Sequence, residues 1–165
     1  MWIPVHLFRV MAQDAGRRLA AQLQNKNGTC GWDVLRTLAV AHDSDDLIPI
    51  VTRALDSQNL VSAQAAALFL GEYGSGSAEE ALWGRLEALW RTWGDRSSEL
   101  RALHSPMSSG DNLLEQTAGL ERALASALSH ATNWKLGPAR LDRLRSDCLT
   151  ESCRDIAAGK MFLNL

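Results

Sequence analysis

Apolar residues between positions 59 and 93 recur at helical spacing in two runs, separated by a short segment rich in Gly and Ser. In the first run, residues 60–70, apolar side chains cover most of the circumference of a helix. Such a helix usually packs between two layers, and small alanine side chains let a neighbouring helix approach closely. The pattern therefore predicts a buried helix. The alanines of this run are Ala63, Ala65, Ala66 and Ala67.

The second run predicts an amphipathic helix with a single buried face. Glu79, Glu87 and Arg91 fall on one side of this helix, and the apolar residues fall on the other. We therefore expect one face to cover the core and the opposite face to meet solvent. The apolar stripe consists of Leu82, Leu86, Leu89 and Trp93, with Trp83 and Trp90 beside it.

The Gly/Ser segment contains residues suited to ending one helix and beginning the next. Gly71 and Gly74 tolerate the left-handed backbone conformation that commonly ends helices. Ser77 followed by Glu80 fits a capping box, in which the two side chains bond to free backbone N–H groups at the helix start. We predict a tight turn here, joining two helices into a hairpin.

A weaker copy of this helix pair precedes it. Residues 32–41 form an apolar helical run, and residues 42–46 contain three aspartates and read as a turn. Residues 47–55 form a second run, with Pro49 expected in its first turn, where a missing N–H removes no helical hydrogen bond.

A third helix pair follows. Asp111 is expected to cap a long helix that ends near Ala131, and Gly137-Pro138 is expected to start the next helix. Thr150 is a candidate cap for a last short helix that ends at Gly159.

Two segments lie outside the three pairs. Residues 4–23 have one apolar face and predict an N-terminal helix. Residues 94–110 are rich in Ser and Gly and predict a surface loop, with a short helix near 98–103 or a role in binding as alternatives.

These elements predict an all-α protein. No segment alternates apolar and polar residues with a period of two, so we expect no sheet. We expect a single helical domain over residues 1–165, made of stacked antiparallel helix pairs at about 32–55, 59–93 and 111–147.

The central unit resembles the HEAT-like helical repeats, the short bacterial kind included. The resemblance is carried by the segment Ala65–Gly74 (AAALFLGEYG), then by Ala78 and Ala81-Leu82. It implies an α-α superhelix in which stacked helix pairs present a groove, and such repeats need neighbouring units to bury their apolar faces.

Charge is unevenly distributed along a chain with a net charge of −2. Residues 61–131 hold five basic and nine acidic residues, whereas residues 132–165 hold six basic and four acidic residues. An acidic middle with several tryptophans favours a protein partner with a basic surface, because Trp is enriched at binding hot spots. The candidate partner-binding residues are Glu72, Glu79, Glu80, Trp83, Glu87 and Trp90.

A basic and aromatic group near the C-terminus supports an alternative. Trp134, Lys135, Arg140 and Arg143 lie close together in sequence, and nucleic-acid-binding proteins combine cationic side chains with aromatic platforms. The HEAT-like repeats include DNA glycosylases that use this combination, so the resemblance implies DNA binding or repair as a second hypothesis.

The three cysteines, Cys30, Cys148 and Cys153, form no CxxC pair and have no histidine at zinc-ligand spacing, so we expect no metal site. We favour reduced thiols in a cytoplasmic protein, with a Cys148–Cys153 disulfide as the alternative. The N-terminus lacks the pattern of a signal peptide, and no apolar run reaches membrane-spanning length.

No catalytic or cofactor motif stands out. The cluster around His42 and the neighbouring aspartates is best interpreted as a solvated turn, and the glycines near position 74 lack a preceding strand and a P-loop lysine. We therefore expect a non-catalytic protein-interaction module without a cofactor. Nucleic-acid binding, and an enzyme with a dispersed site, are the alternatives.

Overall fold

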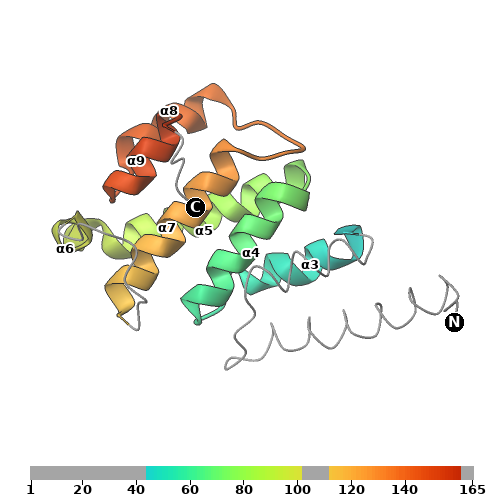
Figure 1. The fold of residues 1–165 in the computed structure, drawn as a ribbon, viewed down its shortest axis with the longest axis horizontal. Helices are drawn as coiled ribbons and strands as arrows, with labels where there is room; N and C mark the ends of the chain where they lie inside the picture. The colour runs from blue at the N-terminus through green and yellow to red at the C-terminus, as the bar shows by residue number, and fades with distance from the viewer. Residues whose placement is uncertain (1–43, 102–111, 161–165) are drawn as a thin grey trace, which may run out of the picture.

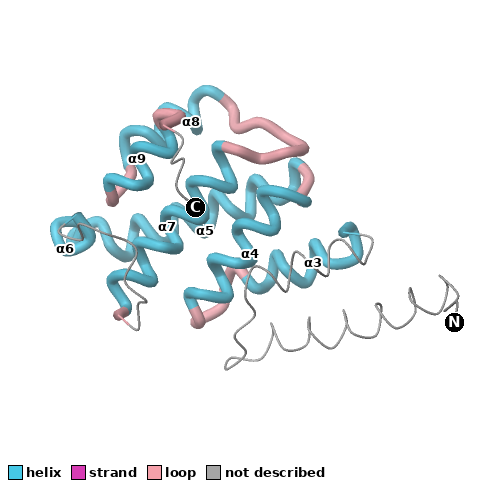
Figure 2. Tube along the Cα trace, viewed as in Figure 1, coloured by secondary structure: helices cyan, strands magenta, loops and turns pink. Residues whose placement is uncertain are grey.

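A computed structural model describes residues 44–101 and 112–160 of the chain. The secondary structure of this part consists of helices joined by loops, with no strand (Figures 1 and 2), which confirms the all-α prediction. The predicted helices at 4–23 and 32–41, and Cys30, lie outside the described residues. The helices are α3 (Ser44–Ala54), α4 (Leu60–Tyr73), α5 (Gly76–Trp93), the 3-10 helix η1 (Gly94–Arg96), α6 (Ser97–Arg101), α7 (Leu113–Ser129), α8 (Pro138–Asp147) and α9 (Glu151–Ala157).

Helix α4 lies in the middle of the core. It packs most extensively against α7 and also packs against α3, while α7 contacts α5 and α9 as well. Ala63, Ala66, Ala67, Phe69 and Leu70 of α4 have no exposed surface. These contacts confirm the prediction of a buried helix between two layers. A helix with small side chains on several faces can pack against neighbouring helices in several directions at once.

Helices α4 and α7 run side by side in the same direction (Figure 1). Near their N-termini, Gln64 Nε2 donates a hydrogen bond of 2.9 Å to the carbonyl of Gln116. Further along, Gly71 lies against Ala127, where a Cβ on the glycine would come within 2.7 Å of the Ala127 Cα. The missing side chain of Gly71 is therefore what permits close contact of the two helices.

Helices α4 and α7 start in the same way, each with an asparagine as N-cap. Asn59 accepts hydrogen bonds from the N–H groups of Val61 and Ser62, and Asn112 accepts one from the N–H of Leu114. Asparagine is a favoured N-cap because its side chain satisfies N–H groups that have no partner within the helix.

The turn between α4 and α5 differs from the prediction. Gly71 is inside α4, and Gly74 ends the helix with an extended backbone (φ −70°, ψ 166°). Among the described residues, only Gly159 has a positive φ, at 73°. The left-handed conformations predicted for Gly71 and Gly74 are therefore wrong, and their roles are close packing: a Cβ on Gly74 would meet the carbonyl oxygen of Leu70.

The predicted capping box is also wrong. Helix α5 begins at Gly76, with Ser75 as its N-cap, so Ser77 already lies inside the first turn. The Ser77 hydroxyl lies 3.0 Å from that of Ser75. Glu80 turns away from the helix start and pairs with Arg140 of α8, because a full positive charge attracts the carboxylate more strongly than a backbone N–H does.

The other predicted helix boundaries agree with the structure in part. Asn112, one residue after the predicted Asp111, caps α7. Pro49 lies inside α3, beyond the predicted first turn. Thr150 caps α9 as predicted, accepting from the N–H of Cys153, and α6 (Ser97–Arg101) overlaps the short helix considered near 98–103.

The connection between α7 and α8 closes the C-terminal end of α4. The N–H of Thr132 donates to the carbonyl of Gly71 at 3.0 Å, and Asn133 Nδ2 donates to the carbonyl of Gly74 at 3.2 Å. The last carbonyls of a helix have no partner within it, so this connection supplies the missing donors and fixes the start of α8 beside α5.

Candidate functional site

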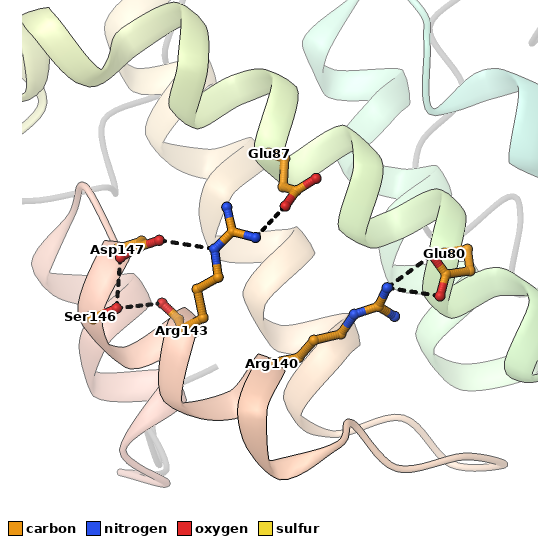
Figure 3. A network of polar contacts seen from close by, with 6 residues as sticks. All are labelled: Glu80, Glu87, Arg140, Arg143, Ser146 and Asp147. Carbon is orange, nitrogen blue, oxygen red and sulfur yellow. Dashed lines mark hydrogen bonds and ion pairs between the residues drawn. The ribbon is translucent and has the colours of Figure 1, made fainter.

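Arg140 of α8 reaches across to the N-terminal part of α5 (Figure 3). Its Nη1 lies 2.6 Å from Glu79 Oε1. Its Nη2 pairs with Glu80, at 2.8 Å from Oε1. The hydrogen bond to Glu79 is the largest cause that raises the pKa of Arg140 above its ordinary value, and the bond to Glu80 adds to it. The guanidinium therefore bridges two carboxylates of α5.

Arg143, one turn further along α8, forms the second bridge (Figure 3). Its Nη1 pairs with Glu87 of α5, and its Nε lies 3.2 Å from Asp147 Oδ2 in its own helix. Ser146 Oγ lies 2.6 Å from the other oxygen of Asp147. Hydrogen bonds to Glu87 first and to Asp147 second raise the pKa of Arg143.

Both guanidinium groups lie over Trp83. The Cζ atoms of Arg140 and Arg143 are 5.4 and 5.6 Å from the centre of the Trp83 ring, within the range of cation–π attraction. The ring itself is only 4% exposed, and Trp90 packs edge-on against it at 5.9 Å. The tryptophan is therefore a covered platform rather than an exposed anchor.

Between the two bridges the surface is hollowed above Gly84. A Cβ added to Gly84 would meet no atom within 4 Å, although this residue is in the middle of an 18-residue helix. A glycine in a helix interior costs about 1 kcal/mol relative to alanine, and no neighbour within the described residues requires the missing side chain. We call this hollow the α5–α8 groove; it is lined by Glu80, Trp83, Gly84, Glu87, Arg140 and Arg143, with Ala139 at its edge.

The groove continues along α5. A second open hollow shares Glu87 and Arg143 with the first and extends past Trp90 to Leu149. Both hollows are shallow, and charged side chains of both signs form their rims. Small-molecule sites are usually concave and mostly apolar, so this surface suits the side chains of another macromolecule better.

The structure thus brings together two groups of residues that the sequence had suggested for different partners. Glu79, Glu80 and Glu87 of the acidic set face Arg140 and Arg143 of the basic set. Trp90 is buried and borders the second hollow. The other candidates lie elsewhere: Glu72 is at the C-terminal end of α4, Trp134 is half-buried in the connection before α8, and Lys135 is exposed.

A second cluster, which the sequence did not suggest, surrounds Glu121 of α7. This carboxylate has no exposed surface and accepts four hydrogen bonds. Oε1 accepts from Trp90 Nε1 at 2.8 Å and from the N–H of Leu149 at 2.7 Å. Oε2 accepts from the N–H and the hydroxyl of Thr150 at 2.9 and 2.6 Å. Glu121 therefore ties α5 and the α8–α9 junction to α7.

Cys148 and Cys153 form a disulfide beside this carboxylate, with Cα atoms 5.6 Å apart. The preference for reduced thiols is therefore wrong: the short turn from the end of α8 into the first turn of α9 brings the two Sγ atoms together. Ligand atoms of Glu121 and both cysteines lie within 4.8 Å of one another, a spacing found at metal sites. Here the sulfurs are bonded to each other and each carboxylate oxygen already accepts two hydrogen bonds. The group therefore has a structural role: it joins α5, α7 and the start of α9.

Reduction of this disulfide is expected to lower the free energy of unfolding by about 2 kcal/mol, because the bond closes a short loop and removes only modest entropy from the unfolded chain. Urea unfolding with and without reductant measures this loss. Thiol titration in denaturant checks the pairing: the three cysteines should yield one thiol per chain before reduction and three afterwards. Three thiols before reduction would contradict the disulfide.

A signal for Glu121 was present in the sequence. It lies four residues after Thr117 and three and seven residues before Leu124 and Leu128, on the face of α7 that is otherwise apolar. A single acidic residue in such a stripe indicates either an exposed edge or a buried carboxylate with several donors. Nothing in the local sequence identifies those donors, which come from α5 and from the start of α9.

Comparisons of the chain with protein-family models, with curated proteins and with solved structures find no match in any of the three. Within residues 44–101 and 112–160, no helix is long and apolar enough to cross a bilayer.

Proposed function

We propose that this chain is a HEAT-like helical-repeat scaffold that binds another protein through the α5–α8 groove. The observation that carries the proposal is the hollow above Gly84: an energetically costly glycine, open to solvent, between two ion-paired bridges. No described residue packs against the space above Gly84, so this space is well suited to close approach by a partner.

The order and direction of the helices support a repeat. In the pairs α4–α5 and α7–α8, the first helices run parallel, and contacts between the second helices also advance in the same direction, from Glu79–Arg140 to Glu87–Arg143. Helix α9 packs against α7, in the position that a further first helix would take. Units that bury their faces against neighbours of the same kind are typical of solenoids.

Matching segments in α5 and α8 add a sequence argument. Gly84-Arg85-Leu86-Glu87 in α5 corresponds to Ala139-Arg140-Leu141-Asp142 in α8. In each helix the arginine contacts the helix pair before its own: Arg85 Nε donates to the carbonyl of Leu55 at 2.8 Å, and Arg140 binds Glu79 and Glu80. This shared role supports two copies of one structural unit.

The test compares two glycine variants of the full chain in affinity capture. Gly84→Gln fills the groove and is expected to reduce recovery of a protein partner by at least tenfold. Gly76→Gln is the matched control, because Gly76 lies in the same helix and a Cβ there also meets nothing within 4 Å. Equal loss in both variants, or in neither, would contradict binding at the groove.

The same experiment separates the alternatives. Nucleic-acid binding through Arg140 and Arg143 would depend on attraction between their charges and the phosphates. Salt weakens this attraction, so we expect any recovered nucleic acid to disappear at moderate salt. Recovery that depends on these two arginines and not on Gly84 would favour the DNA-binding hypothesis. The cytoplasmic location stays a prediction, and the disulfide weighs against it, because disulfides persist mainly in oxidising compartments.

A further inference from the structure

We propose that the face of α5 carrying Glu80, Trp83 and Glu87 is a docking surface for an arginine-bearing helix of a partner protein. In the free chain α8 occupies this surface as an autoinhibitory contact. This inference rests on the proposed function: the partner that approaches the α5–α8 groove displaces α8 and takes its place on the α5 side of the groove.

Helix α8 is attached to α5 mainly by polar contacts. Of its ten residues, only Leu144 is buried. The contacts that reach α5 are the ion pairs of Arg140 and Arg143 and the stacking of their guanidinium groups on Trp83. By contrast, α4 and α7 are joined by closely packed apolar residues. Exposed ion pairs weaken as salt screens them, so α8 is held less firmly than the core helices.

The surface under α8 has the composition of a binding hot spot. Trp83 is 4% exposed, the Arg140 and Arg143 guanidinium groups of α8 lie over its ring, and Glu80 and Glu87 line the same groove. Removing α8 would uncover an aromatic ring with an acidic rim. Tryptophans surrounded by a polar rim contribute strongly to protein–protein binding.

The chemistry of α8 specifies what fits this surface. Arg140 and Arg143 are three residues apart and therefore share one face of the helix, and Leu144 follows directly as the buried apolar residue. A partner helix with the pattern Arg-x-x-Arg-Leu presents the same two guanidinium groups to the same carboxylates. Binding then exchanges intramolecular ion pairs for intermolecular ones, and α8 has to leave.

Displacement of α8 has a defined cost at its N-terminal end. The connection of residues 130–137 has to give up its bonds to the end of α4, from the N–H of Thr132 to the Gly71 carbonyl and from Asn133 Nδ2 to the Gly74 carbonyl. At the other end, the Cys148–Cys153 bond and the bond from Arg145 Nε to the Ala157 carbonyl keep α8 attached to α9. The helix therefore leaves α5 from its N-terminal end.

The first test uses the full chain and a synthetic peptide of residues 137–147, held helical by a side-chain crosslink between positions 142 and 146. In the variant Arg140→Glu plus Arg143→Glu, repulsion from α5 releases α8. We expect this variant to bind the peptide at least tenfold more tightly than the natural sequence does, with NMR shifts at the Trp83 indole. A peptide with glutamine at both arginine positions is the control and should not bind.

Adding Glu79→Gln, Glu80→Gln and Glu87→Gln to that variant should abolish peptide binding, which places the site on α5 rather than on the two introduced glutamates. Absence of binding to the released variant, or equal binding of the glutamine peptide, would overturn the proposal. Far-UV circular dichroism confirms that each variant is folded before the titration.

Hydrogen exchange of the natural sequence provides a second test that needs no variant. We expect amides of α8 to exchange at least tenfold faster than those of α7, and faster still at 0.5 M than at 0.05 M salt, roughly as screening of ion pairs dictates. Exchange of α8 together with α7 at both salt concentrations would refute the inference. A captured partner that depends on Gly84 but is not displaced by the peptide would refute it too, and would leave the proposed function intact.

Discussion

Replacing Glu121 with alanine is expected to lower the free energy of unfolding by about 4 kcal/mol, because several buried donors lose their acceptor at once. The groups affected are Trp90 Nε1–H, the N–H of Leu149, and the N–H and hydroxyl of Thr150. Removing a buried charge offsets part of this loss, so the total is smaller than four separate penalties. Urea unfolding followed by far-UV circular dichroism measures the change.

Glu121→Gln tests the charge of this side chain separately from its shape, because glutamine is uncharged and has nearly the same shape. The amide keeps one acceptor oxygen and turns an NH₂ group toward two donors, so we expect a loss of about 2 kcal/mol. Glu151→Gln, at an exposed position in the first turn of α9, is the control and should change stability by less than about 0.5 kcal/mol. A Glu121→Ala protein as stable as this control would show that the carboxylate does not hold α5 and α9 to α7.

Gly71→Ala is expected to destabilise the protein by about 2 kcal/mol, although alanine is the better helix former. The added Cβ would lie 2.7 Å from the Cα and 2.8 Å from the Cβ of Ala127. Backbone atoms cannot move aside as a flexible side chain does, so α4 and α7 have to separate. Thermal and urea unfolding of the variant measure the loss.

Gly84→Ala is the matched comparison, and its expected effect has the opposite sign. The new methyl group meets nothing within 4 Å, so the variant should gain about 1 kcal/mol from helix propensity alone. Two helical glycines with opposite responses would establish that Gly71 serves packing and that Gly84 serves no packing need among the described residues. Destabilisation by both substitutions would contradict this assignment.

The helices were predictable because their signals are local. The apolar circumference of residues 60–70 and the one-sided stripe of residues 82–93 follow directly from side-chain periodicity, and α4 and α5 appear where these patterns lie. The Thr150 cap was equally predictable, since its hydroxyl accepts a hydrogen bond from a backbone N–H only three residues away. Boundaries were less accurate: neighbouring residues such as Asp111 and Asn112 have the same capping chemistry, and only one of them caps α7.

The candidate site was only half predictable. Sequence identified Glu79, Glu80 and Glu87 as one charged set and Arg140 and Arg143 as another, and assigned them to different partners. About sixty residues separate the two sets in the chain, and no local rule indicates that α8 lies across α5. Because α8 lies across α5 in the fold, the two charged sets pair with each other. Residues that suggested binding to other molecules therefore make contacts within the chain.

By itself the sequence determined the helical class, the approximate extent of the helices and the residue types available for binding, because periodicity and capping depend on neighbours within a few positions. Only the tertiary structure decided the packing role of Gly71, the four bonds of Glu121, the pairing of Cys148 with Cys153 and the covering of Trp83. Three of these four features depend on atoms far apart in the chain, and the fourth, the disulfide, depends on how the turn after α8 is folded. Their energies come from contact and desolvation, which exist only after the helices have packed.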